Sequence, residues 1–305
     1  MPCRTDAVYN PPVGEKSARA HLAVIGGSGL YRLQGARLLE EVEVPTPFGL
    51  PSDLVSIVEV GGRPVAFLPR HGRGHRLLPA EIPARANIWA LKSLGVEQIL
   101  SVSAVGSLQE RIRPGDFVLC DQLIDRTRRR EASFFGEGVV GHVSFAEPYC
   151  PGMRAELEPV LQGSGRPFHA RGCLVCMEGP PFSTRAESNL HRQWGADLIG
   201  MTSLPEAKLA REAEICLALV AMVTDYDCWK EAEEGVSMEL VLRTMSENTR
   251  SIQELLPAMI ARLASRGDCS CRHAAANIIV TDPALIPYQT RRRLALLYGK
   301  YWDKR

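Results

Sequence analysis

The sequence has almost no net charge and no long apolar segment. Its 305 residues carry 36 lysines and arginines against 35 aspartates and glutamates, a formal net charge of +1. So small a charge gives no field that would favour nucleic acid or membrane partners, and we expect small-molecule ligands. No apolar run approaches the roughly 20 residues of a membrane span, and residues 1–20 carry charges without a central apolar stretch. We therefore expect a cytoplasmic protein.

Paired metal-ligand spacing is also missing, although the chain has nine cysteines. Most stand in apolar runs, where cysteine behaves as a small core hydrophobe. Cys269 and Cys271 are the exception, and His273 follows closely. One such pair with one histidine lacks the spacing of structural zinc sites, so we expect no metal. A local redox pair and inert thiols both fit this segment.

Apolar and amphipathic patterns alternate along the chain, which is 45% hydrophobic. Apolar runs predict strands at 21–25, 55–60, 65–68, 98–103, 116–120, 172–177, 198–201 and 215–223. Helical patterns cover 84–94, 184–194, 205–213 and 237–263. This alternation predicts one α/β domain, over residues 21–264, with a mostly parallel sheet and helices on both faces. We expect residues 1–20 to be a flexible extension, and residues 265–305 to form the cysteine turn and a basic helical tail on the same domain.

Two aspartates, Asp225 and Asp227, follow the apolar run 215–223. At the end of a buried strand, residues i and i+2 point to the same side, and ligands bind at such ends in open α/β sheets. Mutual repulsion raises one pKa, so that one carboxyl stays protonated while the other stays ionised. The edge of adenine, with its N7 acceptor and 6-amino donor, matches that combination. A pair of solvated turn aspartates is the alternative.

Polar loops follow several other predicted strands. Gly26-Gly27-Ser28-Gly29 could cradle an anion with backbone N–H groups, or simply form a tight turn. Arg70 and His71 place a planar cation beside an imidazole, which suits a phosphate dianion. The serine-rich segment 101–107 adds hydroxyls at the same predicted edge. Phe182 could stack on a base and Met201 could pack under a ribose, although each also suits a core.

Several motifs together resemble the 5'-methylthioadenosine phosphorylases of the trimeric purine nucleoside phosphorylase family. They are IGGSGL (25–30), RHGRGH (70–75), EGPPFSTRAES (178–188), GMTSLPE (200–206) and TDYDCWKE (224–231), in order from about residue 21 to 263. The resemblance implies a pentosyltransferase on a mixed, mostly parallel sheet. It would cleave methylthioadenosine with phosphate as a homotrimer, with or without pairing of trimers, in purine and methionine salvage. Neither a metal nor an organic cofactor is implied.

The resemblance also implies a role for individual residues. The phosphate site would consist of Ser28, Arg70, His71, Ser103, Ala104 and Thr202. The nucleoside site would consist of Phe182, Met201, Thr224, Asp225, Asp227, His142, Met238 and Val241, with His142 reaching in from a neighbouring subunit. Asp225 would share a proton with N7, a general-acid role worth roughly 100- to 10,000-fold. Pro181 and Gly200 depart from the common arginine and asparagine of the family, and Gly200 removes an amide near the ribose.

Three other functions remain open. A phosphorylase for guanosine, inosine or methylthioinosine would need an amide donor for the 6-oxo group, where this chain has Asp227. A hydrolase would use water, and Arg70 and His71 would then lack a purpose. A non-catalytic nucleotide-binding module would be consistent with a degenerate site at Pro181 and Gly200.

Overall fold

The computed structural model describes residues 19–27, 30, 33, 35–230, 238–263 and 268–302. Nearly all of the predicted N-terminal extension, and Ser28 and Gly29 of the first glycine loop, lie outside these residues. Among the helices described, none is both long and apolar enough to cross a membrane.

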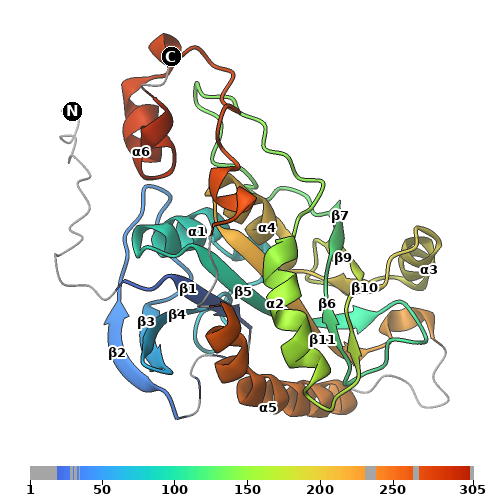
Figure 1. Ribbon diagram of the computed structural model, residues 1–305. Helices are drawn as coiled ribbons and strands as arrows, with labels where there is room; N and C mark the ends of the chain where they lie inside the picture. Colours follow the sequence, from blue (N-terminus) through green and yellow to red (C-terminus); the bar gives the residue numbers. More distant parts are fainter. Residues whose placement is uncertain are drawn as a thin grey trace.

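The described strands form one 11-stranded sheet (Figure 1). Its main path runs β2 (Arg37–Val42), β3 (Val55–Val60), β4 (Arg63–Pro69), β1 (Leu22–Gly26), β5 (Gln98–Ser107), β10 (Leu198–Gly200), β9 (Cys173–Met177) and β7 (Gln122–Arg126). Off this path, β11 (Cys216–Asp225) pairs with β5 and β6 (Phe117–Leu119), and β6 pairs with β8 (Phe168–His169).

The sheet is mixed and its centre is parallel, as predicted. Strands β4, β1, β5 and β11 run in one direction, so their carboxyl ends share an edge. Strand β10 is antiparallel to β5 and pairs Leu198 with Ser107. The residues that follow β10 therefore lie beside the middle of β5. Segment 101–107, which the sequence suggested as a loop beyond 98–103, is the second half of β5.

Helices cover both faces of the sheet, and side-chain alternation along the strands assigns the faces. One face packs against α2 (Pro151–Gln162) and α5 (Met238–Leu263), using Val24, Leu100 and Val220 among other side chains. The opposite face packs against α1 (Ala84–Ser93), α4 (Ser203–Glu212) and α6 (Tyr288–Tyr298), using Ala23, Ile99 and Leu219. Helix α3 (Arg185–Gln193) lies near β9 and β10, away from these layers (Figure 1).

Some elements escaped prediction for identifiable reasons. Strand β2 is mostly exposed, and β7 carries polar and charged residues, so neither shows a buried apolar run. Helix α2 buries Met153, Leu157 and Leu161 at four-residue intervals, but Pro159 interrupts its sequence pattern. These elements depend on partners elsewhere in the chain, which local patterning does not reveal.

Candidate active site

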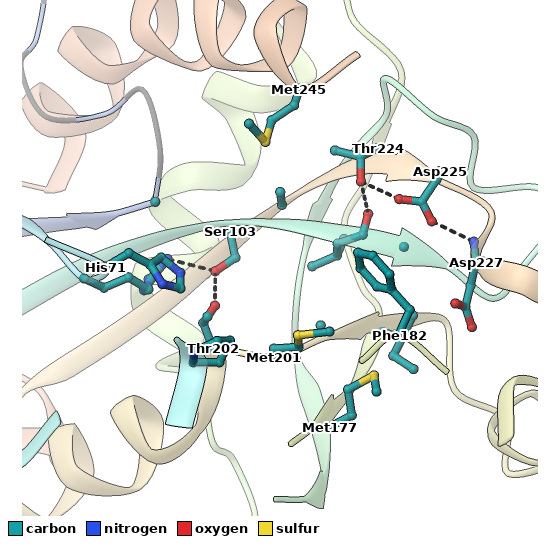
Figure 2. Close-up of a pocket in the computed structure, with 18 of the residues that line it drawn as sticks. His71, Ser103, Met177, Phe182, Met201, Thr202, Thr224, Asp225, Asp227 and Met245 are labelled. Atoms are coloured by element: carbon teal, nitrogen blue, oxygen red, sulfur yellow. Dashed lines mark hydrogen bonds between the residues drawn. The ribbon is translucent and has the colours of Figure 1, made fainter. Parts of the chain in front are cut away.

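A cavity of about 270 Å³ lies where the ends of β11 and β4 meet the middle of β5 (Figure 2). It brings together most of the predicted site residues: Arg70, His71, Ser103, Ala104, Phe182, Met201, Thr202, Thr224, Asp225 and Asp227. Gly27 of the first glycine loop, His75 of the RHGRGH motif and Gly106 of segment 101–107 also line it, as do Met177, Ile199 and Met245, which the sequence did not single out. The cavity thus unites segments that are more than 150 residues apart, between Arg70 and Asp227.

Four predicted residues are not among those that line this cavity. Ser28 lies outside the described residues, although its neighbour Gly27 lines the cavity. Met238 and Val241 belong to α5, whose Met245 does line it, but the side chains of both lie outside the description. His142 is exposed on a loop that bonds to the C-terminal segment, where its N–H donates to the Ile278 carbonyl. From its own chain, His142 does not enter the cavity.

The guanidinium of Arg70, which directly follows β4, is almost completely enclosed by protein groups. Its Nε donates to Glu206 Oε1 at 2.7 Å and Nη2 donates to Glu206 Oε2 at 3.1 Å. Further hydrogen bonds reach Ser101 Oγ at 2.7 Å, the Val102 carbonyl at 2.8 Å and Ser103 Oγ at 3.1 Å. The side chain is therefore fixed and its charge is neutralised by a buried partner, which differs from the open phosphate cation that the sequence suggested.

His71 is held as a neutral imidazole. Its Nδ1 lies 2.8 Å from the Leu77 carbonyl, and since a carbonyl only accepts, Nδ1 carries the proton. Burial lowers the pKa of His71 to about 4. The ring stacks on His75 with centroids 4.2 Å apart. In this tautomer Nε2 carries the lone pair, so it can accept a hydrogen bond or take up a proton from a ligand.

Two hydroxyls from different elements meet beside Arg70. Ser103 on β5 lies 3.0 Å from Thr202, which follows β10, between their oxygen atoms. The neighbouring Ala104 is an exposed position on an otherwise buried strand. This hydroxyl pair, beside the exposed Ala104, offers an anion donors from two elements.

The two aspartates lie at the opposite side of the cavity (Figure 2). Both line the cavity as predicted, but strand β11 ends at Asp225 after a bulge and Asp227 begins a short 3₁₀ helix, so the i to i+2 strand geometry invoked for the pair does not hold. Asp225 Oδ1 accepts from the Asp227 N–H at 2.8 Å, and Oδ2 accepts from Thr224 Oγ1 at 2.7 Å. This contact stabilises the left-handed φ of +50° at Asp227, a conformation that non-glycine residues rarely adopt.

The surroundings of Asp227 disfavour its charged form. Burial raises the pKa of Asp227, and the charge of Asp225 raises it further. Among the described residues, its Oδ2 has no hydrogen-bond partner. Burial therefore favours the protonated form of Asp227, whereas the sequence argument placed the proton on Asp225.

Apolar side chains occupy the space between the two polar regions (Figure 2). Met177, Met201 and Met245 contribute thioethers, and the Phe182 ring is 73% exposed, which leaves it open to stacking. A Cβ at Gly106 would lie 3.0 Å from Asp225 Oδ1, so a larger residue there would need the Asp225 carboxylate to shift. A side chain at Gly200 would bring its Cβ to 3.3 Å from Val105 Cγ1, so a larger residue would need Val105 to shift.

Comparisons with known proteins agree with this geometry. The profile of the phosphorylase superfamily matches residues 21–261. S-methyl-5'-thioadenosine phosphorylase from Koribacter versatilis is 49% identical over 286 residues, covering 94% of this chain and 98% of the relative. The corresponding protein from Chloroflexus aurantiacus is 51% identical over 285 residues, covering 93% and 99%.

Solved structures give the same result. A methylthioadenosine phosphorylase from an Antarctic soil metagenomic library is 46% identical, with a TM-score of 0.88 over 92% of this chain and 99% of the other. A mutant adenosine/methylthioadenosine phosphorylase from Schistosoma mansoni, in complex with methylthioadenosine, is 36% identical, with a TM-score of 0.78 over 84% and 96%.

Proposed function

The chain belongs to the phosphorylase superfamily, among its S-methyl-5'-thioadenosine phosphorylases, and we propose that phosphate cleaves 5'-methylthioadenosine in the cavity described. The products are adenine and 5-methylthioribose 1-phosphate. The bond between the sugar C1' and adenine N9 breaks, and a bond between C1' and a phosphate oxygen forms.

The main support for this proposal is that polar groups lie at two opposite sides of the cavity, with apolar groups between them. Ser103, Thr202 and His71 lie at one side, the two aspartates lie at the other, and apolar groups lie between them (Figure 2). Cleavage of an N-glycosidic bond makes the sugar cationic and the departing purine anionic. An anion beside the sugar and a proton donor beside the base therefore lower the barrier, and the cavity offers sites for both.

Phosphate would bind among Ser103, Thr202, the Ala104 backbone and His71. The two hydroxyls lie 3.0 Å apart, within the span of one phosphate group. Arg70 donates a hydrogen bond to Ser103 and also pairs with Glu206. It would therefore act chiefly by holding Ser103 in position and by supplying positive charge. Ser28 follows Gly27, which lines the cavity, and would add a further hydroxyl.

Adenine would bind between Phe182 and the aspartates, with N7 beside Asp225 and the 6-amino group beside Asp227. A 6-amino group donates to an ionised carboxylate, so base binding favours the ionised form of Asp227. The proton of the pair then moves to Asp225, from which it reaches N7 as the C1'–N9 bond breaks. Because two coupled carboxyls titrate as a unit, both are needed for this transfer.

The remaining contacts would come from α5 and from a second subunit. Met245 lies on α5 and lines the cavity, and Met238 and Val241, which belong to the same helix, would meet the methylthio end. His142 is exposed and does not enter its own cavity, which supports a homotrimer in which it reaches a neighbouring site. We further propose that the reaction needs no metal or organic cofactor and takes place in the cytoplasm.

Steady-state kinetics with three nucleosides test the proposed substrate. We expect the highest kcat/KM with methylthioadenosine, because Asp227 accepts from its 6-amino group and the methionines suit its thioether. Methylthioinosine changes only the 6-substituent, and adenosine changes only the 5' end. Equal or higher kcat/KM with methylthioinosine would support the 6-oxopurine alternative instead.

A further inference from the structure

Four cysteines that are distant in sequence meet at the end of β11 remote from the aspartates. Cys150 precedes α2, Cys216 begins β11, and Cys269 and Cys271 lie at the short 3₁₀ helix η3 (Ser270–His273). Their Sγ atoms all lie within 4.8 Å of one another. Cys150, Cys216 and Cys271 are buried and Cys269 is half-buried, so the cluster is enclosed.

The spacing of the sulfur atoms matches the donor set of a tetrahedral metal site. Zinc–thiolate bonds of about 2.3 Å in a tetrahedron give sulfur–sulfur distances of about 3.8 Å. The Sγ atoms of Cys150 and Cys269 lie 3.6 Å apart, and the structure gives the cysteines as thiols. Thiolates are ligands that select Zn²⁺, and a closed set of four is typical of structural sites.

We propose that Cys150, Cys216, Cys269 and Cys271 bind one Zn²⁺ ion as a structural site. Binding replaces four S–H bonds with four Zn–S bonds and releases four protons to solvent, with no change in oxidation state. The resulting site has a net charge of −2. Arg211, whose charge is felt at Cys271, would partly balance it.

Metal binding displaces the four thiol protons, so it competes with protons and becomes weaker as pH falls. The sequence argument against a metal considered only Cys269, Cys271 and His273, and it could not include Cys150 and Cys216, which the fold brings in.

The position of the cluster indicates stabilisation and not catalysis. Strand β11 has 10 residues, and at about 3.3 Å per residue its two ends are about 30 Å apart. Zinc at Cys216 would join the C-terminal segment to β11 and to the start of α2. Loss of the metal should lower the melting temperature while leaving kcat nearly unchanged.

Metal analysis of the full-length protein, purified under reducing conditions without chelator, tests the proposal. We expect about one zinc per chain, and a loss of at least tenfold in zinc content in Cys150→Ser and in the double variant Cys269→Ser/Cys271→Ser. Cys173→Ser is the matched control, because Cys173 is a half-buried thiol on β9 outside the cluster, and it should retain zinc. Equal zinc content in all variants would place the metal elsewhere and overturn the proposal.

A second measurement covers variants that fail to fold. Reduced wild-type protein, stripped of metal, is titrated with Co²⁺ and then with Zn²⁺. We expect the intense visible absorption of tetrahedral cobalt thiolate, its displacement by zinc, and a higher melting temperature with zinc than without it. If neither the cobalt absorption nor zinc uptake is seen, the proposal is overturned. Disulfides among the four cysteines of freshly isolated protein, detected by mass spectrometry after alkylation, would also overturn it.

Discussion

Arg70 and Glu206 form a doubly hydrogen-bonded ion pair beside Ser103, with N–O distances of 2.7 and 3.1 Å. The two side chains are only 1% and 2% exposed. The pair connects the end of β4 to helix α4, and Ser101 also bonds to both partners. Because Arg70 is held by these contacts, it fixes the positions of the serine hydroxyls to which it donates hydrogen bonds.

Arg70→Ala should destabilise the protein strongly, since it leaves the Glu206 carboxylate buried without its partner. Breaking such a pair costs about 3–5 kcal/mol, to be measured by urea unfolding. Arg73→Ala is the control, because Arg73 is 39% exposed and its ion pairs should contribute at most about 1 kcal/mol. In the folded fraction of Arg70→Ala, KM for phosphate should rise more than KM for methylthioadenosine. Equal rises in the two KM values would mean that Arg70 is purely structural.

Asp225→Asn should lower kcat/KM by about 100- to 10,000-fold, the range of general-acid catalysis, while the fold remains intact. Loss of the Asp225 charge also removes one cause of the raised Asp227 pKa. Activity that requires a protonated carboxyl declines as pH rises through the pKa of that carboxyl. Because the pKa of Asp227 should be lower in the variant, its residual activity should decline at a lower pH than wild-type activity. A variant with more than half of wild-type kcat/KM would rule out this role of Asp225.

Asp227→Asn should change the preferred purine. An amide can donate to a 6-oxo group, whereas the carboxylate accepts from a 6-amino group. The ratio of kcat/KM for methylthioadenosine over methylthioinosine should fall by about tenfold, the equivalent of about 1.4 kcal/mol for one hydrogen bond. If that ratio is unchanged, Asp227 does not contact the 6-substituent.

His71 should make the folded state sensitive to acid. Its pKa is lowered by burial from 6.5 to about 4, so the unfolded chain binds more protons between these values. The free energy of unfolding contributed by this group is therefore complete above pH 6.5 and declines as pH falls toward 4. In the variant His71→Asn, the free energy of unfolding should decline less as pH falls, and His75→Asn serves as the neighbouring control. If the free energy of unfolding has the same pH dependence in wild type and in His71→Asn, the assignment is contradicted.

The sequence predicted most of the central strands because each is a buried apolar run, and it predicted the site because polar groups follow those runs. Strand geometry does not relate Asp227 to Asp225, because the chain turns after Asp225, whose carboxylate accepts the Asp227 N–H. The ion pair between Arg70 and Glu206 could not be predicted, because it joins residues 136 positions apart. The cysteine cluster likewise depends on tertiary contacts between β11, α2 and η3, which no local spacing encodes.

Adenine release from methylthioadenosine, measured with and without inorganic phosphate, tests the central claim most directly. The account predicts no appreciable release without phosphate, a rate that saturates as phosphate increases, and one 5-methylthioribose 1-phosphate formed per adenine. Release at the same rate in phosphate-free buffer would identify a hydrolase. No release in saturating phosphate would identify a binding protein, and either result would contradict the proposed phosphorolysis.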